Sequence, residues 1–441
     1  MKEIFLKRMQ SILGNQYNDF LVALNQEPKK AFYLNQKKIN AIDILDQLKI
    51  KAHPYIKNGF YYDSYEYALG KSPYYHCGLY YIQEPSAMVV GDLLDVKPND
   101  YILDMCAAPG GKTCQVAMKL SDQGLMIAND ITSMRASILS QNVERMGLTN
   151  TIVTNTDPIH FDKIFQGYFD KIILDAPCSG EGMFRKLDKA IETWSIDKVN
   201  ECAYIQKKLV DSAFKMLKEG GLLIYSTCTY SIEENEAIVE YACQNFDFET
   251  IHLTKQKGMV SGINHDDVIR LYPHINYGEG HFIALLQKKA STKTKKIKLI
   301  QTNISNDQLK LVQKFYHTYL NLEVPKNLYC SNDHVYAIKP HFPMMEKTKI
   351  LRTGLHLGIC KKGRFEPSHA LALTLQPNDV KQAYYFNVGS LEVQKYLQGH
   401  TLEGTNQKGY GVIFVDNFPL AFYKESNQQV KNLYPKGLRR P

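Results

Sequence analysis

The nine cysteines of this 441-residue chain are dispersed, and none of them forms a C-x-x-C pair. An odd number of scattered cysteines indicates neither a disulfide scaffold nor a zinc site. The chain also lacks an apolar run that could cross a membrane, and its opening residues, MKEIFLKRMQ, lack the continuous apolar core of a signal peptide. We therefore expect a protein of the reducing cytoplasm, without a metal or membrane partner, in which free thiols can act as nucleophiles.

Two common nucleotide-binding patterns are missing as well. The spacing G-x-x-x-x-G-K-[ST] does not occur, which excludes a Walker loop, and the absence of G-x-G-x-x-G argues against a dinucleotide-dependent oxidoreductase. A solvated surface explains the net charge of +8 about as well as a polyanionic partner does. With 44% hydrophobic residues the chain can bury full cores, and its length predicts two or three globular domains.

Two short apolar runs that each lead to a cysteine are the most informative feature of the chain. Residues 172–174 predict a buried parallel strand, after which the chain breaks at Asp175-Ala-Pro-Cys178. A second predicted strand leads in the same way to Cys228. Because chemistry in open α/β sheets sits beyond the carboxyl ends of the strands, we expect the carboxyl group and the two thiols to lie together.

Strands and helices alternate from Tyr101 onward. Alternation at this spacing predicts a doubly wound, mostly parallel α/β sheet. Ser231 and Glu234 have the spacing of a capping box at the start of one of the helices. The expected strands are Tyr101–Met105, Gly124–Asn129, Thr151–Thr154, Lys171–Leu174, Leu222–Ser226 and His281–Gln287, and the expected helices are Lys112–Leu120, Arg135–Met146, Lys198–Leu217 and Glu233–Asn245.

The loop of residues 106–112, which reads CAAPGGK, follows the first strand and opens a helix. Its small residues and two glycines let the backbone approach a ligand closely, and Lys112 can add a charge for a carboxylate. A tight turn between strand and helix is the alternative interpretation. Asp130 and Asp157 end the next two strands, where a carboxylate can bind a ribose or an adenine amino group, or can cap a helix.

Three stretches carry a family resemblance: DMCAAPGGKT at residues 104–113, DAPCSGEGMFRK at 175–186 and YSTCTYSIEENE at 225–236. In this order they resemble the motifs of S-adenosylmethionine-dependent RNA cytosine-C5 methyltransferases of the Sun/NSUN type. The resemblance covers most of the chain and is closest to the bacterial RsmF-like ribosomal RNA enzymes. It implies a Rossmann-like class I methyltransferase fold, S-adenosylmethionine as the cofactor and RNA as the partner.

The resemblance also implies roles for individual residues. Cys228 would add to carbon 6 of cytosine, Cys178 would assist release of the methylated product, and Asp175 would protonate or hydrogen-bond N3 of the base. Bare chemistry would permit the two thiols to exchange roles. The residues implied to bind S-adenosylmethionine are Cys106, Ala107, Ala108, Pro109, Gly110, Gly111, Lys112, Asp130, Asp157 and Asp175.

Four parts follow along the chain. Residues 1–75 are expected to form a small α+β domain that contacts RNA, and residues 76–289 the methyltransferase domain. Residues 290–348 are expected to be a basic linker and connecting segment, since six lysines occur in Lys288–Lys298, and residues 349–441 a PUA-like β-rich domain that binds RNA.

Smaller features complete these expectations. The apolar spacing predicts a helical face over Phe5–Leu24 and a second helix over Ala41–Leu48. Tyr33 stands where the family usually has an arginine, which puts an RNA contact by that side chain in doubt. The segment Gly180–Lys186 is expected to be a mobile basic loop suited to a backbone phosphate.

The substrate is less defined than the chemistry. Small-subunit (16S) ribosomal RNA is the leading hypothesis, because the end of the chain resembles the RsmF-like enzymes. Transfer RNA is the alternative substrate, and an RNA-binding assembly factor is the alternative from the class of non-enzymes. We expect the protein to act as a monomer.

Overall fold

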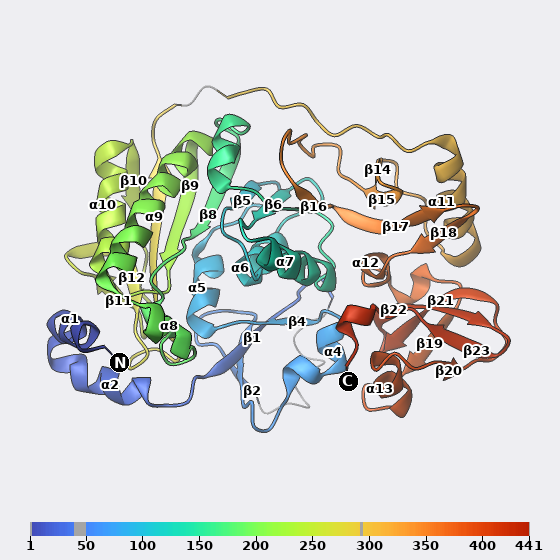
Figure 1. The fold of residues 1–441 in the computed structure, drawn as a ribbon, viewed down its shortest axis with the longest axis horizontal. Helices are drawn as coiled ribbons and strands as arrows, with labels where there is room; N and C mark the ends of the chain where they lie inside the picture. Colours follow the sequence, from blue (N-terminus) through green and yellow to red (C-terminus); the bar gives the residue numbers. More distant parts are fainter. Residues whose placement is uncertain (1, 39–49, 292–293, 441) are drawn as a thin grey trace.

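The computed structural model describes residues 2–38, 50–291 and 294–440 of the chain. Within these residues, the centre of the molecule is a ten-stranded sheet, in which the neighbouring strands β9-β8-β5-β6-β7 run parallel (Figure 1). These strands are largely buried on both faces, which is why continuous apolar runs form them. Their bounds are β5 (Tyr101–Asp104), β6 (Leu125–Asn129), β7 (Thr151–Thr154), β8 (Phe169–Asp175) and β9 (Leu217–Thr227).

Antiparallel strands extend the sheet at both edges. On one side β13 (His281–Lys288) pairs with β9 and is followed by β12 (His265–Leu271) and β11 (Val260–Gly262), while β10 (Phe248–Ile251) also pairs with β13. On the other side β16 (Ile350–Thr353) pairs with β7. Residues just beyond position 349, where the C-terminal domain is expected to begin, therefore complete the central sheet.

Helices cover both faces of the central sheet. Ile102 and Leu103 of β5 are both fully buried, and because successive strand residues point to opposite faces, they enter different apolar clusters. The first cluster includes α5 (Pro85–Leu93), α6 (Gly111–Ala117) and α7 (Ser133–Arg145), and the second includes α9 (Ile196–Met216) and α10 (Glu236–Asn245). The predicted doubly wound sheet is confirmed.

The order of the strands creates one special position. From β5 the chain moves outward through β6 and β7, and it then returns to place β8 on the other side of β5. The carboxyl ends of β5 and β8 therefore flank a topological switch point, where α/β folds bind their ligands.

The N-terminal part differs in detail from the sequence prediction. The helical face predicted over Phe5–Leu24 is divided into α1 (Glu3–Leu13), the 3₁₀ turn η1 (Gly14–Gln16) and α2 (Tyr17–Leu24), because Gly14 ends α1 with a φ of 52°. A four-stranded antiparallel sheet in the order β2-β3-β1-β4 follows. Its strands are β1 (Lys30–Leu34), β2 (Ile50–Ala52), β3 (Gly59–Tyr62) and β4 (Tyr80–Ile82), accompanied by η2 (Leu69–Lys71) and α4 (Pro73–His76). The helix predicted over Ala41–Leu48 lies outside the described residues.

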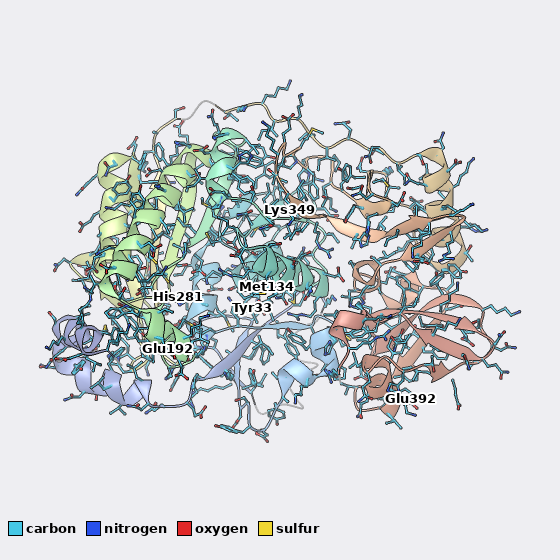
Figure 2. The ribbon with its side chains drawn as sticks, viewed as in Figure 1. Tyr33, Met134, Glu192, His281, Lys349 and Glu392 are labelled. Atoms are coloured by element: carbon cyan, nitrogen blue, oxygen red, sulfur yellow. The ribbon has the colours of Figure 1, made fainter. Side chains whose placement is uncertain are left out.

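Two residues of this domain are buried and hydrogen-bonded inside the protein. Tyr33 is 2% exposed and its hydroxyl accepts a hydrogen bond from Gln36, so its ring lies inside the molecule (Figure 2). Asn35 is fully buried and donates hydrogen bonds to the backbone oxygens of Gly78 and Met146, each at 2.9 Å. The Asn35 contacts join the N-terminal domain to the methyltransferase domain.

The C-terminal part holds two smaller sheets. Residues 294–305 run along the top of the view in Figure 1 to α11 (Asn306–Tyr319). Lys288, expected at the start of the linker, instead ends β13 and is fully buried, with its ammonium hydrogen-bonded to the carbonyl of Leu217 at 2.9 Å. The first sheet contains β14 (Leu328–Ser331), β15 (His334–Ala337), β17 (Leu355–Lys361) and β18 (Arg364–Pro367). The second sheet contains β19 (Ala383–Phe386), β20 (Leu402–Glu403), β21 (Gly409–Val415), β22 (Phe418–Ser426) and β23 (Gln429–Asn432). The helical segments are α12 (His369–Ala372), η6 (Pro377–Asp379), α13 (Leu391–Leu397) and η7 (Lys436–Leu438).

The N-terminal and C-terminal domains pack against each other. Phe32 and Tyr80 of the N-terminal sheet belong to the same apolar cluster as Ile413, Leu420 and Tyr423 of the C-terminal sheet. All five side chains are nearly or completely buried. Two domains that are distant in the sequence therefore share one core.

A buried ion pair holds one edge of the central sheet to its helix layer. The Arg270 guanidinium of β12 donates to both carboxylate oxygens of Glu236 in α10, at 2.7 and 2.5 Å, and both residues are at most 2% exposed. We expect Arg270→Met to lower the free energy of unfolding by about 3–5 kcal/mol, because it leaves a buried carboxylate without its cation. Urea unfolding followed by circular dichroism measures this loss.

An exposed ion pair of the same sheet provides the control. Lys289 and Glu249 form a salt bridge in which both side chains are about half exposed. Lys289→Met is expected to cost about 1 kcal/mol or less. Equal losses for the two variants would contradict the importance assigned to the buried pair.

Candidate active site

The two predicted thiols meet at the carboxyl edge of the central sheet. Cys178 follows β8 and Cys228 follows β9, and because these strands are parallel neighbours, their ends lie side by side. The sulfur atoms are 3.3 Å apart, and both residues are partly exposed. The structure thus brings together two thiols that are fifty positions apart in the sequence.

Asp175, the last residue of β8, lies in the same place. Lys112 donates to one carboxylate oxygen and Ser226 to the other, both at 2.8 Å. Burial acts to raise the pKa of Asp175, but the charge of Lys112 and these two hydrogen bonds outweigh it, so that the pKa lies below its ordinary value. Asp175 is therefore an anionic hydrogen-bond acceptor beside the two thiols.

The two thiols are within hydrogen-bond distance of each other. The hydrogen bond with Cys228 and burial raise the pKa of Cys178 well above its ordinary value. Cys178 consequently keeps its proton at neutral pH and can donate it toward the sulfur of Cys228.

A buried carboxylate supports the segment that carries Cys228. Glu181 is 2% exposed and accepts hydrogen bonds from the side chains of Trp194, Thr229 and Ser231 and from the backbone N–H of Tyr230, at 2.7–2.9 Å. Three of these donors follow Cys228 directly in the chain. The η4 turn (Glu181–Met183) and the Cys228 loop are thereby held together.

The mobile basic loop predicted at Gly180–Lys186 is not what the structure shows. The Arg185 side chain is 7% exposed, and its guanidinium donates to Glu279 at 2.7 Å and to the backbone oxygen of Ala23 at 2.9 Å. Lys186 lies 3.4 Å from the same glutamate. Because these internal contacts use its cations, the segment is an anchored part of the site rather than a free phosphate-binding loop.

The predicted capping box is also wrong. The Ser231 side chain makes no cap hydrogen bond at η5 (Ile232–Glu234). Glu234 instead reaches across to the Cys178 loop, where it accepts hydrogen bonds from the backbone and hydroxyl of Ser179 at 2.9 and 2.5 Å, and from Gln206. Burial raises the pKa of Glu234 to about 7.

This raised pKa predicts a pH dependence of stability. The folded protein keeps the Glu234 proton up to about pH 7, whereas the unfolded chain releases it near the ordinary pKa of 4.5. The stabilisation linked to this proton is therefore complete below pH 4.5 and is lost as the pH rises through 7. We expect Glu234→Gln to remove this dependence, changing the difference in unfolding free energy between acidic and neutral solution by about 3 kcal/mol.

Urea unfolding of the wild type and the variant across this pH range measures the effect. Glu192→Gln, at an exposed position on α8 (Asp188–Thr193), provides a matched control that is expected to follow the wild type (Figure 2). Identical pH dependence of all three proteins would contradict the protonation of Glu234 in the folded state.

The loop of residues 106–112 connects β5 to the first turn of α6. Gly110 has a φ of 109°, and a Cβ at this position would lie 2.9 Å from Leu139, so only glycine fits the turn. Asp104, at the end of β5, accepts a hydrogen bond from the Thr113 hydroxyl at 2.7 Å. Burial raises the pKa of Asp104 to about 7.

These features fit the expected S-adenosylmethionine. The second carboxylate oxygen of Asp104 is buried and has no hydrogen-bond partner among the described residues, which is the environment that a ligand ammonium group would satisfy. Lys112, expected to bind the ligand carboxylate, is aimed at Asp175. The sequence motif contains Asp104, but no role was predicted for it. Its position at the topological switch point identifies it as a candidate ligand-binding residue.

The two remaining aspartates occupy different positions. Asp130 is 2% exposed, accepts the Thr132 N–H at 2.8 Å and lies 3.5 Å from the guanidinium of Arg135, which also donates to the carbonyl of Ala108 in the loop. Asp157 is exposed and caps η3 (Pro158–Lys163). Asp130 thus lies next to the loop of residues 106–112, whereas Asp157 caps a helical turn.

His281 is a site residue that the sequence reasoning missed. It begins β13 and is 6% exposed (Figure 2). Its Nε2 is 3.9 Å from Asp175, and its Nδ1 lies 3.3 Å from the hydroxyl of Ser86, which is hydrogen-bonded to Glu84. Burial lowers the pKa of His281, so the imidazole is neutral at physiological pH. Its antiparallel strand pairing, rather than a motif, brings it to the site.

No helix of the part of the chain that the structure describes is long and apolar enough to cross a membrane. No group of three His, Cys, Asp or Glu residues in the described ranges could hold a metal ion.

Family models match four successive segments of the chain. Residues 92–287 match the model described as 16S rRNA methyltransferase RsmB/F, and residues 1–85 match the N-terminal domain of 16S rRNA methyltransferase RsmF. Residues 314–375 match the first C-terminal domain of the RsmF rRNA methyltransferase, and residues 385–440 match the methyltransferase RsmF PUA domain.

Curated relatives are similar over the whole length. The ribosomal RNA small subunit methyltransferase F of Vibrio vulnificus strain YJ016 is 30% identical over 465 residues, which cover 100% of this chain and 98% of the relative. The protein of the same name from Shewanella sp. strain MR-4 is 31% identical over 457 residues, which cover 96% of this chain and 93% of the relative.

Solved structures are similar over about two thirds of the chain. A methyltransferase homologue from Pyrococcus horikoshii is 30% identical with a TM-score of 0.58, over 65% of this chain and 95% of that protein. The structure of NSun6 from Pyrococcus horikoshii with SFG has a TM-score of 0.59 at 23% identity, over 66% of this chain and 99% of that protein, a likeness of fold.

Proposed function

The chain belongs to the 16S rRNA methyltransferase RsmB/F family, and from this membership and the site geometry we propose that it transfers a methyl group from S-adenosylmethionine to carbon 5 of a cytosine in small-subunit ribosomal RNA. The observation that carries the proposal is the pair of thiols 3.3 Å apart, beside the Lys112–Asp175 ion pair. Carbon 5 of cytosine is a poor nucleophile, and addition of a thiolate to carbon 6 converts the ring into an enamine that can accept a methyl group.

We assign the nucleophilic thiolate to Cys228. The raised pKa of Cys178 supports this assignment, because a protonated Cys178 can donate a hydrogen bond to the attacking sulfur. Asp175, held anionic by Lys112, accepts a hydrogen bond from the exocyclic amino group or the protonated N3 of the base. It thereby stabilises the positive charge that favours addition to carbon 6.

The second half of the reaction restores the aromatic ring. Bound S-adenosylmethionine supplies the methyl group that carbon 5 receives. The carbon-5 proton then passes to water, the bond between carbon 6 and the Cys228 sulfur breaks, and its electron pair returns to sulfur. Loss of the N3 proton to solvent leaves neutral 5-methylcytosine. Cys178 lies in contact with that sulfur and is proposed to assist this elimination. A cytosine within a helix must first leave its stack to reach the site.

The proposed cofactor site consists of the loop Cys106-Ala107-Ala108-Pro109-Gly110-Gly111-Lys112 together with Asp130, Asp157 and Asp175. The free oxygen of Asp104 and the close backbone at Gly110 support this site. The proposed domains are residues 1–75, 76–289, 290–348 and 349–441. Free cysteines support a reducing cytoplasm, and we propose that the protein acts as a monomer.

Methyl transfer from labelled S-adenosylmethionine to three RNAs tests the function. Naked small-subunit ribosomal RNA, assembled small subunits and total transfer RNA are each incubated with the protein and digested to nucleosides. We expect label in 5-methylcytosine from one of the ribosomal samples. Label in transfer RNA alone would overturn the substrate and keep the chemistry, and no label in any sample would favour an assembly factor.

A further inference from the structure

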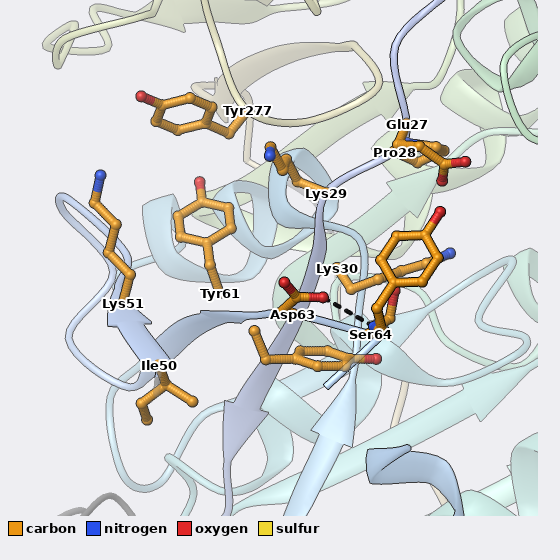
Figure 3. A pocket seen from close by; sticks show the side chains of 12 residues that line it. Glu27, Pro28, Lys29, Lys30, Ile50, Lys51, Tyr61, Asp63, Ser64 and Tyr277 are labelled. Carbon is orange, nitrogen blue, oxygen red and sulfur yellow. Dashed lines mark hydrogen bonds between the residues drawn. The ribbon is translucent and has the colours of Figure 1, made fainter. Parts of the chain in front are cut away.

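A pocket of about 600 Å³ lies at the open edge of the N-terminal sheet, outside the active site (Figure 3). It is formed by the chain before β1, by β2 and by the end of β3, and one wall comes from the methyltransferase domain through Tyr277. Its volume is in the range of ordinary small-ligand sites. Neither the cofactor loop nor the two thiols line it.

Aromatic rings make up much of its surface. Tyr277 is 55% exposed and its ring stands edge-on to that of Tyr61, with centroids 5.7 Å apart. Tyr65 is 83% exposed and lines the same pocket. Large exposed rings that face a shared cavity offer flat surfaces on which a nucleobase can stack.

Lysines stand around these rings. The ammonium of Lys51 lies 5.5 Å from the centroid of the Tyr277 ring, and Figure 3 shows Lys29 beside the same tyrosine. Lys30 also lines the pocket. None of the three lysines has an ion-pair partner among the described residues.

Two acidic residues also line the pocket, and both have other contacts. Asp63 accepts the backbone N–H of Tyr65 at 2.8 Å, and Glu27 is hydrogen-bonded to the Tyr65 side chain. Three lysines against two engaged carboxylates leave the pocket with a positive balance. Stacking surfaces combined with ammonium groups are typical of sites for single-stranded RNA.

The wall at Tyr277 is directly connected to the active site. His281, 3.9 Å from Asp175, lies four residues further along the chain, so at most about 14 Å of backbone separates the two positions. The intervening segment is fixed, because Glu279 accepts from Arg185 and donates its N–H to Glu84. A second pocket of about 430 Å³ shares Tyr277 with the first and includes Arg185.

We propose that this pocket binds an unpaired nucleotide of the RNA strand that carries the target cytosine, with its base on Tyr277 and its phosphate near Lys51 and Lys29. The inference rests on the proposed function and adds a subsite to it. The site takes a nucleotide close to the target along the strand, because the two positions are separated by only a short fixed segment. Occupancy of the pocket then helps to hold the target base at the thiols.

Binding of a fluorescein-labelled ten-nucleotide oligocytidine RNA to the full-length protein tests the stacking contact. Tyr277→Ala is expected to weaken binding about tenfold, measured by fluorescence anisotropy, because a base loses its aromatic partner. Tyr277→Phe, which keeps the ring, is expected to restore the affinity. The KM for naked small-subunit ribosomal RNA is expected to rise with Tyr277→Ala by a similar factor.

A tyrosine–lysine pair elsewhere on the surface provides the control. Tyr204 on α9 is 61% exposed and lies under the ammonium of Lys208, as Tyr277 does under Lys51. Tyr204→Ala is expected to bind as the wild type does; a loss as large as that of Tyr277→Ala would indicate diffuse surface binding and overturn the pocket. Lys51→Gln is expected to reduce the slope of log affinity against log salt by about 0.7, and an unchanged slope would overturn the phosphate contact.

The outcomes separate this inference from the proposed function. If the wild type methylates RNA while Tyr277→Ala matches it in both affinity and KM, the pocket proposal fails and the function stands. If the wild type binds oligocytidine through Tyr277 but methylates none of the RNAs, the function fails and the pocket stands.

Discussion

Replacing Cys228 with alanine is expected to abolish methyl transfer to RNA, lowering the turnover number by about four orders of magnitude or more. Without the thiolate, carbon 6 of cytosine receives no nucleophile, and the ring does not become the enamine that accepts the methyl group. The cofactor loop is on a different strand end, so binding of S-adenosylmethionine is expected to persist. Labelled methyl transfer and titration calorimetry measure the two properties separately.

Cys243→Ala provides the matched control for this variant. Cys243 is an exposed thiol on α10, and it is not one of the residues at the carboxyl edge of the sheet. Its replacement is expected to leave turnover unchanged. Methylation of cytosine by Cys228→Ala at a rate near that of the wild type would refute the nucleophilic role.

Replacing Cys178 with alanine is expected to stop the reaction at a later stage. The Cys228 sulfur can still add to the base, but its elimination loses the neighbouring thiol 3.3 Å away. Loss of a group that assists proton transfer typically slows a step by 10²–10⁴, so we expect turnover to fall by about a hundredfold or more. A covalent protein–RNA species should accumulate and appear as a slowly migrating band on a denaturing gel.

The double variant Cys178→Ala/Cys228→Ala identifies the sulfur in that band. It is expected to form no covalent species, because the attacking thiol is absent. An adduct that appears with Cys228→Ala and not with Cys178→Ala would mean that the two thiols exchange roles, as the bare chemistry permits.

Local sequence patterns predicted the doubly wound core of the central domain. The strands β5, β6, β7, β8 and β13 were predicted within a few residues, because strands that are buried on both faces must be continuously apolar, whereas β9 begins at Leu217, five residues before its predicted start at Leu222. The strands β10, β11, β12 and β16 of the same sheet were not predicted. The convergence of Asp175, Cys178 and Cys228 followed from the same reasoning, since the ends of parallel strands share one edge. The family motifs, which are contiguous in the sequence, indicated the chemistry and the cofactor.

Only the tertiary structure decided which contacts the polar residues make. Glu234 and Ser231 have capping-box spacing, yet Glu234 bonds to Ser179 across two loops, because the buried site offers it more donors than the helix end does. Arg185 is a basic loop residue in the sequence but a buried partner of Glu279 in the fold. Long-range pairing of this kind depends on packing and leaves no local periodicity.

The placement of whole segments was likewise a tertiary outcome. His281 reaches Asp175 through an antiparallel strand pairing, and β16 joins the central sheet from beyond the linker. The N-terminal and C-terminal sheets share one apolar cluster, although their residues are more than 300 positions apart. The sequence by itself determined the strands, the thiols and the cofactor loop, because local apolar runs and contiguous motifs encode them. Only the tertiary structure decided what surrounds the thiols and which residues form the pocket at Tyr277, because segments that are distant in the sequence pack together there.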